Sequence, residues 1–309
     1  MAAVFPVASG VGTHSGTLTP EVWSGKTLVK FYKSTIFGDI SNTDYEGEIK
    51  AFGDTVHINK TPDITIRDYH IGQKLLRERP APEIIDLTID KGKYWSVKIN
   101  KVQLAQAYMK YVEDWTDDAG QQMGISIDSS VLSTAYSSAS AYNAGNTAGY
   151  VSGSYALGTS TAPLGLDKTN ILDFLVDMGS CLSELNVPHT QRWCALSEIF
   201  CNMIKKSDIK DASMTGDAQS VMRNGRIGII DRFTLYVSNQ IATTADGSGE
   251  TAHNVMAGHK SGISFASQLV ENRTIPDPDD FGDIMEGLQV YGFNVLKPEA
   301  LVHGYVYKM

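Results

Sequence analysis

The sequence predicts an α+β fold, in which strands and helices follow one another without regular alternation. Apolar and polar residues alternate over much of the segment from residue 55 to residue 99, the period of a strand with one buried face. A helical period then runs through residues 101–136, and shorter helices and strands mix from residue 167 onward. Because no strand–helix–strand repeat is present, the pattern is typical of the α+β class.

The composition is that of a globular protein and limits its partners. Of 309 residues, 42% are hydrophobic and 20% are charged, which is close to ordinary usage. The formal net charge is −9, whereas proteins that grip nucleic acid usually present a basic surface. We therefore expect no sequence-specific DNA binding, although a wall around DNA need not bind it. No apolar run is long enough to predict a membrane span, and no signal peptide is evident.

The cysteines indicate structural thiols. Cys181, Cys194 and Cys201 are odd in number and match no metal-binding spacing. We expect three buried, unpaired side chains and synthesis in a reducing cytoplasm.

The first hundred residues predict an arm, a helix and a hairpin system. Residues 1–18 are uncharged and rich in small residues, so they predict an arm that cannot fold alone. A helix start at Thr19, Pro20 and Glu21 predicts a helix to about Ser34. Residues 45–100 predict a long β-hairpin system, whose alternating segments are 55–58, 64–67, 85–89 and 95–99. Its exposed tip, residues 69–82, is charged and contains prolines.

The next segment predicts a helix too long for one compact globule. Residues 101–136 would extend about 50 Å as a single helix. Residues 137–163 carry no charge and predict an extended loop or irregular hairpin, whose role stays open.

The remaining residues predict short elements. A helix capped by Asp167 or Thr169 should end before Pro188, and a second helix should begin at Ser197. Another helical piece should end near Asn224. The predicted strands are 192–196, 226–230, 233–238, 254–257, 288–296 and 301–307, with a glycine-rich loop at 243–251.

Two acidic clusters could suggest chemistry, but both favour a surface role. Asp277, Asp279 and Asp280 begin like a calcium-binding loop, yet Phe281 and Leu288 stand where ligands are required. Glu113, Asp114, Asp117 and Asp118 have the spacing of a solvated helix face. No catalytic or cofactor motif accompanies them, so we expect no enzyme activity, no cofactor and no metal.

Four segments, in this order, resemble the major capsid proteins of tailed phages with the Hong Kong 97 fold. The resemblance is greatest to the group related to the coat protein of Salmonella phage P-twenty-two. The segments begin at TPEVWSGKTLVKFYK, KYWSVKINKVQLAQAYMK, RWCALSEIFCNMIKK with NGRIGIIDRFTLYVSN, and FGDIMEGLQVYGFNV. One departure is Asp231 with Arg232, at a place where a glycine commonly precedes the aromatic residue.

The resemblance implies a division of the chain into the parts of a capsid subunit. These are an N-terminal arm (1–18), an N-terminal helix region (19–44), an extension loop with peripheral-domain strands (45–100), a spine helix with its following loop (101–166), an axial domain (167–280) and closing peripheral-domain strands (281–309).

The resemblance also implies a function and partners. The chain would assemble as hexamers and pentamers into an icosahedral shell around double-stranded phage DNA, with scaffold and portal proteins as partners and the virion as its location. An encapsulin-like shell around protein cargo is the alternative. The extension loop would contact a neighbouring copy through Arg67, Asp68, Tyr69, Lys74, Arg77, Arg79 and Glu83.

Overall fold

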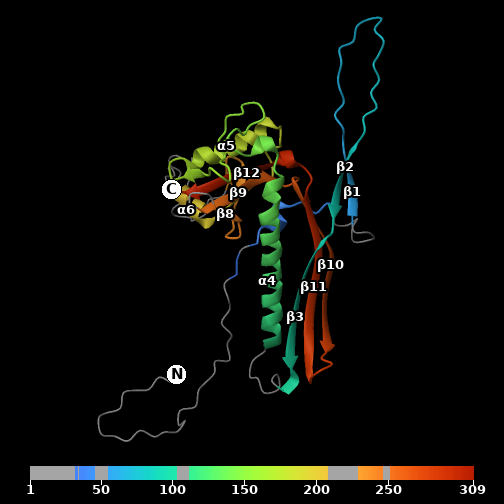
Figure 1. The fold of residues 1–309 in the computed structure, drawn as a ribbon, viewed down its shortest axis with the longest axis vertical. Coiled ribbons are helices and arrows are strands. Elements are labelled where there is room, and N and C mark those ends of the chain that lie inside the picture. The colour runs from blue at the N-terminus through green and yellow to red at the C-terminus, as the bar shows by residue number, and fades with distance from the viewer. Residues whose placement is uncertain (1–31, 34, 46–54, 103–110, 208–228, 246–250) are drawn as a thin grey trace, which may run out of the picture.

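A computed structural model describes residues 32–33, 35–45, 55–102, 111–207, 229–245 and 251–309. It consists of a globular unit, an elongated unit in which a long helix runs beside three strands, and a hairpin that projects from the elongated unit (Figure 1). The predicted arm and the helical piece ending near Asn224 lie outside the described residues, as does the helix predicted at 19–34 except for residues 32 and 33, which are not helical.

The globular unit is built on a seven-stranded mixed sheet with the order β4-β12-β9-β5-β7-β6, in which β8 pairs with β9. β5 and β7 run parallel, as do β12 and β4, whereas the other pairs are antiparallel. The strands are β4 (Leu164–Leu166), β5 (Arg192–Leu196), β6 (Ile229–Ile230), β7 (Phe233–Val237), β8 (Thr243–Ala245), β9 (Thr251–His259) and β12 (Leu301–Lys308).

The central strand β5 is buried along its whole length because both faces of the sheet are covered. Cys194 and Leu196 join one apolar cluster with the helices α5 (Ile171–Glu184) and α6 (Glu198–Lys206). Trp193 and Ala195 join a second cluster on the opposite face. Successive side chains of a strand point to opposite faces, which explains why a continuous apolar run forms a strand here.

A buried guanidinium joins helix α5 to strand β5. The side chain of Arg192 is only 2% exposed. It donates to the carbonyl oxygens of Gly179 (3.2 Å), Val187 (2.8 Å) and Pro188 (2.9 Å). These bonds satisfy the buried cation and fix the connection between the two elements.

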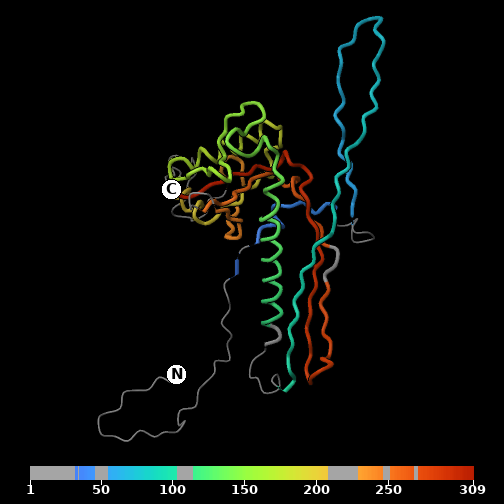
Figure 2. The backbone as a smooth tube through the Cα atoms, viewed as in Figure 1, coloured from blue at the N-terminus to red at the C-terminus, as the bar shows by residue number. Residues whose placement is uncertain are grey.

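The elongated unit consists of an antiparallel sheet and the helix α4 (Tyr111–Thr134), which runs alongside it (Figure 2). The sheet has the order β10-β11-β3 and comprises β3 (Lys91–Asn100), β10 (Ile263–Pro276) and β11 (Gly282–Val295). Ile127 of α4 packs with Phe265 and Tyr291 of the sheet. No helix among the described residues has the length and apolar character needed to cross a membrane.

One carboxylate connects three parts of the chain. Asp128 on α4 is fully buried and accepts the backbone N–H groups of Ile36 (3.0 Å) and Phe37 (2.8 Å). It also accepts the side-chain amide of Gln240, at 2.8 Å, from the loop after β7. The N-terminal segment with α1 (Phe37–Ile40), the long helix and the globular unit therefore meet at Asp128.

The projecting hairpin is formed by β1 (Thr55–Lys60) and β2 (Glu83–Thr88), which pair antiparallel. At the base of the hairpin, the chain passes from β2 into β3, and there it packs against β11. A side chain at Gly292 would place a Cβ atom 2.2 Å from the carbonyl oxygen of Thr88, so only glycine allows this close approach. Leu87 and Ile89 are buried at this base with Ala266.

The uncharged stretch is folded back over the globular unit. It contains the short 3-10 helices η1 (Ala135–Ser138) and η2 (Ala141–Asn143), and Ala148 pairs antiparallel with Tyr155. Ala148 and Leu157 are fully buried in the same cluster as α5. Of the two predicted forms, an extended loop or an irregular hairpin, the structure has an irregular hairpin with one bridge, and part of it belongs to the core.

Several sequence predictions need correction. Residues 64–67 form no strand, because the chain there has no paired neighbour. β3 pairs with β11 and not with β2, so residues 45–100 are not one continuous hairpin system. Strand β10 was not predicted, and β8 forms within the predicted loop at 243–251. The expected boundary between residues 280 and 281 placed β10 in the axial domain and β12 with the closing peripheral-domain strands. In the structure, β10 shares the three-stranded sheet with β3 and β11, whereas β12 lies in the sheet of the globular unit.

The cysteines provide a test of the core. All three thiols are free and buried. Burial raises the pKa of Cys181 to about 12 and that of Cys201 to about 11, and burial also raises the pKa of Cys194. Because the thiolate is the reactive form, the folded chain should resist a thiol reagent at about pH 8. Labelling followed by mass spectrometry should detect three reactive thiols only after denaturation, and rapid labelling of the native chain would contradict this core.

Candidate assembly surfaces

The most exposed feature of the structure is the loop of residues 61–82 that connects β1 to β2. Figure 1 shows it projecting well beyond the globular and elongated units. A hydrogen bond from the Gln73 N–H to the His70 carbonyl oxygen, 3.0 Å, closes a turn at its tip. Gly72 has φ +85°, as the third residue of a type II turn requires. We call residues 61–82 the projecting loop.

The two sides of the projecting loop are held together by a carboxylate. Glu78 accepts a hydrogen bond from the Arg67 guanidinium and another from the backbone N–H of Thr65. These two bonds, that from Arg67 first, lower the pKa of Glu78 below its ordinary value. The loop thus has an internal cross-connection, although its strand pairing stops at Lys60 and Glu83.

The structure places all seven predicted contact residues on the surface of the hairpin. Arg67 pairs with Glu78 in its own loop, and Glu83 lies 3.9 Å from Lys60. The others make no ion pair within the part of the chain that the structure describes: these are Asp68, Tyr69, Lys74, Arg77 and Arg79. Three cationic side chains of the loop therefore lack a partner among the described residues of their own copy.

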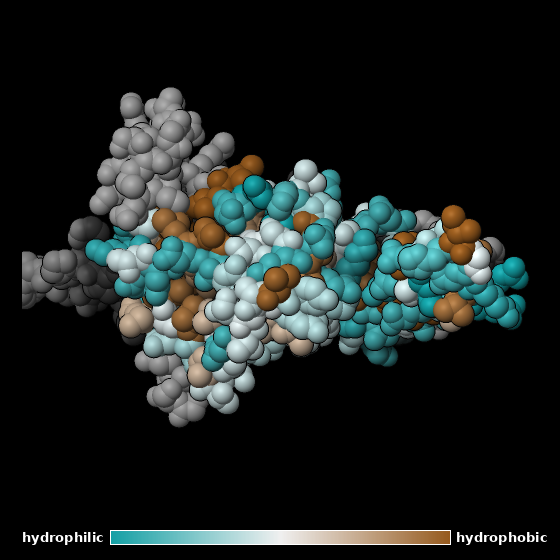
Figure 3. Space-filling model, turned by 90° about the horizontal axis from the view of Figure 1, so that it is seen from above, coloured by the Kyte–Doolittle hydropathy of each residue, from teal (hydrophilic) through white to brown (hydrophobic). Residues whose placement is uncertain are grey.

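The projecting loop also exposes aliphatic side chains, none of which is among the seven predicted contact residues. Ile71 is 98% exposed and Ile66 is 91% exposed. Ile64, Leu75 and Leu76 are each about two-thirds exposed. Full burial of such a side chain is worth about 1.5–3 kcal/mol, so a neighbouring surface that covered several of them would gain considerable free energy. Seen from above, brown apolar groups lie among teal polar ones on this side of the molecule (Figure 3).

An acidic end lies at the turn between β10 and β11. Lys98 forms ion pairs with Asp277 and, at 3.7 Å, with Asp280, while Lys101 lies 3.0 Å from Asp283. The bond from Lys98 lowers the pKa of Asp277. Two residues of the suggested calcium loop, Asp277 and Asp280, thus pair with Lys98. Within the described residues, no group of three potential metal ligands is found.

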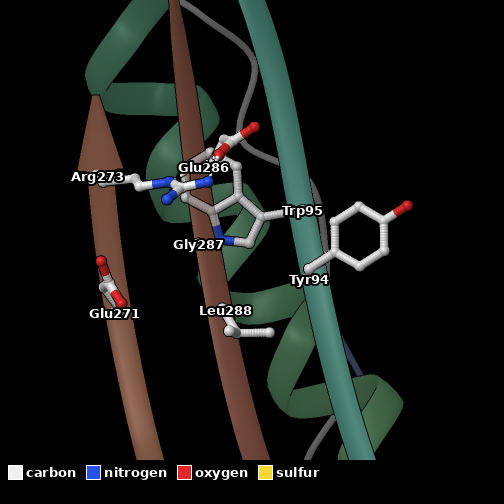
Figure 4. Close-up of a pocket in the computed structure, with 7 residues that line it drawn as sticks. All are labelled: Tyr94, Trp95, Glu271, Arg273, Glu286, Gly287 and Leu288. Carbon is white, nitrogen blue, oxygen red and sulfur yellow. Dashed lines mark hydrogen bonds and ion pairs between the residues drawn. The ribbon is translucent and has the colours of Figure 1, made fainter. Parts of the chain in front are cut away.

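The same elongated unit has a shallow depression on its sheet (Figure 4). It has a volume of about 280 Å³ and is lined by Tyr94, Trp95, Glu271, Arg273, Glu286, Gly287 and Leu288. Figure 4 shows Arg273 of β10 beside Glu286 of β11, and their atoms Nη2 and Oε2 are 2.8 Å apart. These lining residues combine aromatic rings with the paired side chains of Arg273 and Glu286, a composition that suits a contact surface.

One carboxylate of the second acidic cluster, that of Asp118, also lies in a structural contact. The hydroxyl group of Tyr32 donates to Asp118 at 3.0 Å.

In the globular unit, burial lowers the pKa of His303 to about 4, and its Nε2 atom lies 3.2 Å from Asn254 Oδ1. His303 is therefore neutral at physiological pH and part of the core.

Comparisons with known proteins identify the fold. No protein-family model matches the sequence, and the comparison with curated proteins gives no match. A solved structure from Mycobacterium phage Che8 superposes with a TM-score of 0.77 at 22% sequence identity, covering 93% of this chain and 96% of the other. This chain has the fold of phage capsid structures. The capsid structure of the cyanophage P-SCSP1u matches with a TM-score of 0.72 at 15% identity, over 100% of this chain and 99% of that one.

The match extends over nearly the whole chain in each case. The mature capsid of bacteriophage PhiM1 matches with a TM-score of 0.71 at 15% identity, covering 94% of this chain and 92% of the other. The globular unit, the elongated unit and the hairpin together therefore form one capsid fold of the α+β class. At these identities the likeness establishes the fold, and the function has to be argued from the surfaces.

Proposed function

We propose that this chain is the major capsid protein of a tailed phage, in the group related to the Salmonella phage P-twenty-two coat protein. Many copies would assemble as hexamers and pentamers into an icosahedral shell around double-stranded DNA. The observation that carries the proposal is the projecting loop, which extends outside the subunit and exposes both apolar and cationic side chains. An isolated soluble chain gains nothing from such an element, whereas a subunit covered by neighbours does.

The parts of the Hong Kong 97 fold can be assigned to the observed elements. The projecting loop is the extension loop, α4 is the spine helix and the three-stranded sheet is the peripheral domain. The globular unit is the axial domain. It includes β12, because this strand belongs to the seven-stranded sheet. The predicted arm, residues 1–18, would reach a further copy.

Charge supports a contact between the projecting loop of one copy and the elongated unit of another. The loop carries Lys74, Arg77 and Arg79 without ion pairs among the described residues. The β10–β11 hairpin carries six acidic residues and one base of its own, Arg273. Four of the acids form ion pairs with Arg273, Lys98 or Lys101, whereas Glu271 and Asp279 form none among the described residues. Complementary charges of this kind guide association and fix its register.

The proposed contents and partners follow from the same picture. The net charge of −9 suits a protein that encloses DNA without binding its phosphates tightly. Scaffold and portal proteins would direct the closure of the shell, and the subunits would be made in the host cytoplasm before they become part of the virion.

Particles from cells that produce the chain with its phage should sediment far faster than a free subunit and should protect DNA from nuclease. Sedimentation followed by nuclease treatment measures both properties. Fast particles that hold protein and no DNA would favour the encapsulin-like alternative. A chain that stays monomeric under all assembly conditions, including with its scaffold, would contradict both.

A further inference from the structure

The surface of the uncharged stretch carries its own apolar group. Tyr150 is 58% exposed and Val151 is 77% exposed, and Tyr142 lies beside them on the surface. The rings of Tyr142 and Tyr150 meet edge to face, with their centres 5.1 Å apart. No charged residue occurs from 129 to 166. We call Tyr142, Tyr150 and Val151 the neutral tip.

The neutral tip is held in one conformation by bonds to the rest of the globular unit. Glu184 at the end of α5 accepts the backbone N–H groups of Val151 (2.7 Å) and Ser152 (3.1 Å). Asn143 donates to the carbonyl oxygens of Glu299 and Leu301, each at 2.8 Å. A surface that is already ordered loses little conformational entropy when it docks, so the neutral tip is suited to a specific contact.

A hollow of about 490 Å³ lies on another side of the globular unit. Its volume is within the range of pockets that hold small ligands, so it can accommodate side chains such as Tyr150 and Val151. Its charged side chains are of opposite sign, Lys33 and Asp39. It is lined by Tyr32, Lys33, Thr35, Ile36, Asp39, Leu235, Tyr236, Val237 and Asn239.

The positions of the tip and the hollow suit a ring of identical copies. In Figure 1 the yellow-green stretch lies at the top of the globular unit, whereas the blue segment at 35–40 lies on its underside. A head-to-tail contact between two different surfaces closes into a ring when the rotation permits. The projecting loop points the same way as the yellow-green stretch (Figure 1), so one neighbour would receive both.

Charge explains why a second copy is the fitting occupant. Each copy has a net charge of −9, so two copies repel one another wherever their acidic surfaces meet. The stretch from 129 to 166 itself adds no charge to a contact, and the carboxylate beside the tip, Glu184, is engaged by the Val151 and Ser152 N–H groups. The two charges of the hollow, on Lys33 and Asp39, are of opposite sign. Pale, near-neutral residues cover much of the middle of the molecule seen from above, with teal around them (Figure 3).

We propose that the neutral tip of one copy docks into the hollow of the next copy around a ring of subunits. This inference rests on the proposed function, because the ring is the hexamer or pentamer of the shell. It gives the uncharged stretch a second role besides its part in the core, as a lateral contact near the centre of each ring.

Site-specific cross-linking tests the contact. Val151→Cys and Asn239→Cys place one thiol on the tip and one at the hollow, and both positions are exposed. The three native thiols are buried and should not compete. In assembled shells, a short bis-maleimide should give the double variant a ladder of multimers up to the closed ring. Each single variant should give at least tenfold less product, and mixed single variants should give only dimers.

The outcomes separate this contact from the function. If the double variant forms shells and does not cross-link, the tip contacts something else, such as a different protein, and the inference is wrong while the capsid function stands. If Val151→Cys alone links to itself, the contact is symmetric and the inference is also wrong. If the unmodified chain forms no shells with its scaffold, both the function and this contact are contradicted.

Discussion

Replacing residues 61–82 with Asn-Gly should abolish shell formation and leave the fold of the subunit intact. Lys60 and Glu83 are paired across the strands, so a two-residue turn can join them directly. The residues removed from 63 to 82 are all exposed. Shortening the loop from 22 residues lowers the entropy cost of its closure, which stabilises the subunit by up to about 2 kcal/mol. Thermal unfolding of free subunits and particle yield by sedimentation are the two measurements.

Two milder variants separate the contributions of charge and apolar area. Lys74→Gln with Arg77→Gln and Arg79→Gln removes the cations and keeps the apolar side chains. Ile71→Ser with Leu75→Ser and Leu76→Ser does the reverse. If apolar burial dominates, the serine variant should lose more shells, because each covered side chain is worth about 1.5–3 kcal/mol whereas exposed ion pairs contribute about 0–1 kcal/mol. Loss of subunit stability in the shortened variant, with normal shells, would assign the loop to the subunit's own core.

Asp128→Ala should destabilise the subunit by about 3 kcal/mol or more. The substitution leaves the N–H groups of Ile36 and Phe37 and the Gln240 amide without their acceptor, and each buried unsatisfied group costs about 1–3 kcal/mol. Ser129→Ala, at an exposed neighbour on the same helix, is the control and should change stability by less than about 0.5 kcal/mol. Chemical denaturation of free subunits measures the difference. Equal stabilities of the two variants would contradict the three-way joint.

Asp128→Asn should retain most of the stability, because its amide oxygen still accepts both backbone N–H groups. Burial raises the pKa of Asp128 above its ordinary value of 3.8, so the folded state holds the proton more tightly than the unfolded state. The stability that this group contributes is therefore fully present below about pH 3.8 and declines as pH rises through the raised pKa. The asparagine variant should lack this part of the pH dependence, which denaturation at several pH values would measure.

The sequence predicted elements whose local pattern agrees with their surroundings. The continuous apolar run of β5 predicted a buried strand, and the start of helix α6 was predicted at Ser197, the residue just before its first turn, whose hydroxyl group makes no capping hydrogen bond. The departure at Asp231 and Arg232 also has an explanation. Both have positive φ, 44° and 66°, in the turn between β6 and β7, and aspartate tolerates that conformation.

The missed elements depend on information that is not local. β10 has a register shift between Ser267 and Leu269. Such a shift interrupts the alternation of side chains between the two faces, which is the pattern by which a strand is predicted from sequence. Ile64 and Ile66 alternate like a strand, yet they have no neighbour to pair with and are exposed. Their period of two predicts an apolar face, but it does not tell whether that face is covered by the same chain or by another copy. The exposure of Lys74, Arg77 and Arg79 was predicted correctly, because charges near Pro80 and Pro82 favour a surface position.

Electron cryo-microscopy of purified particles tests the central claim most directly. We expect closed shells of pentamers and hexamers in which residues 61–82 of each subunit lie on a neighbouring subunit. In such shells, Ile66 and Ile71 should be covered by that neighbour. Closed shells in which this loop stays in solvent, or the absence of shells with the scaffold present, would contradict it.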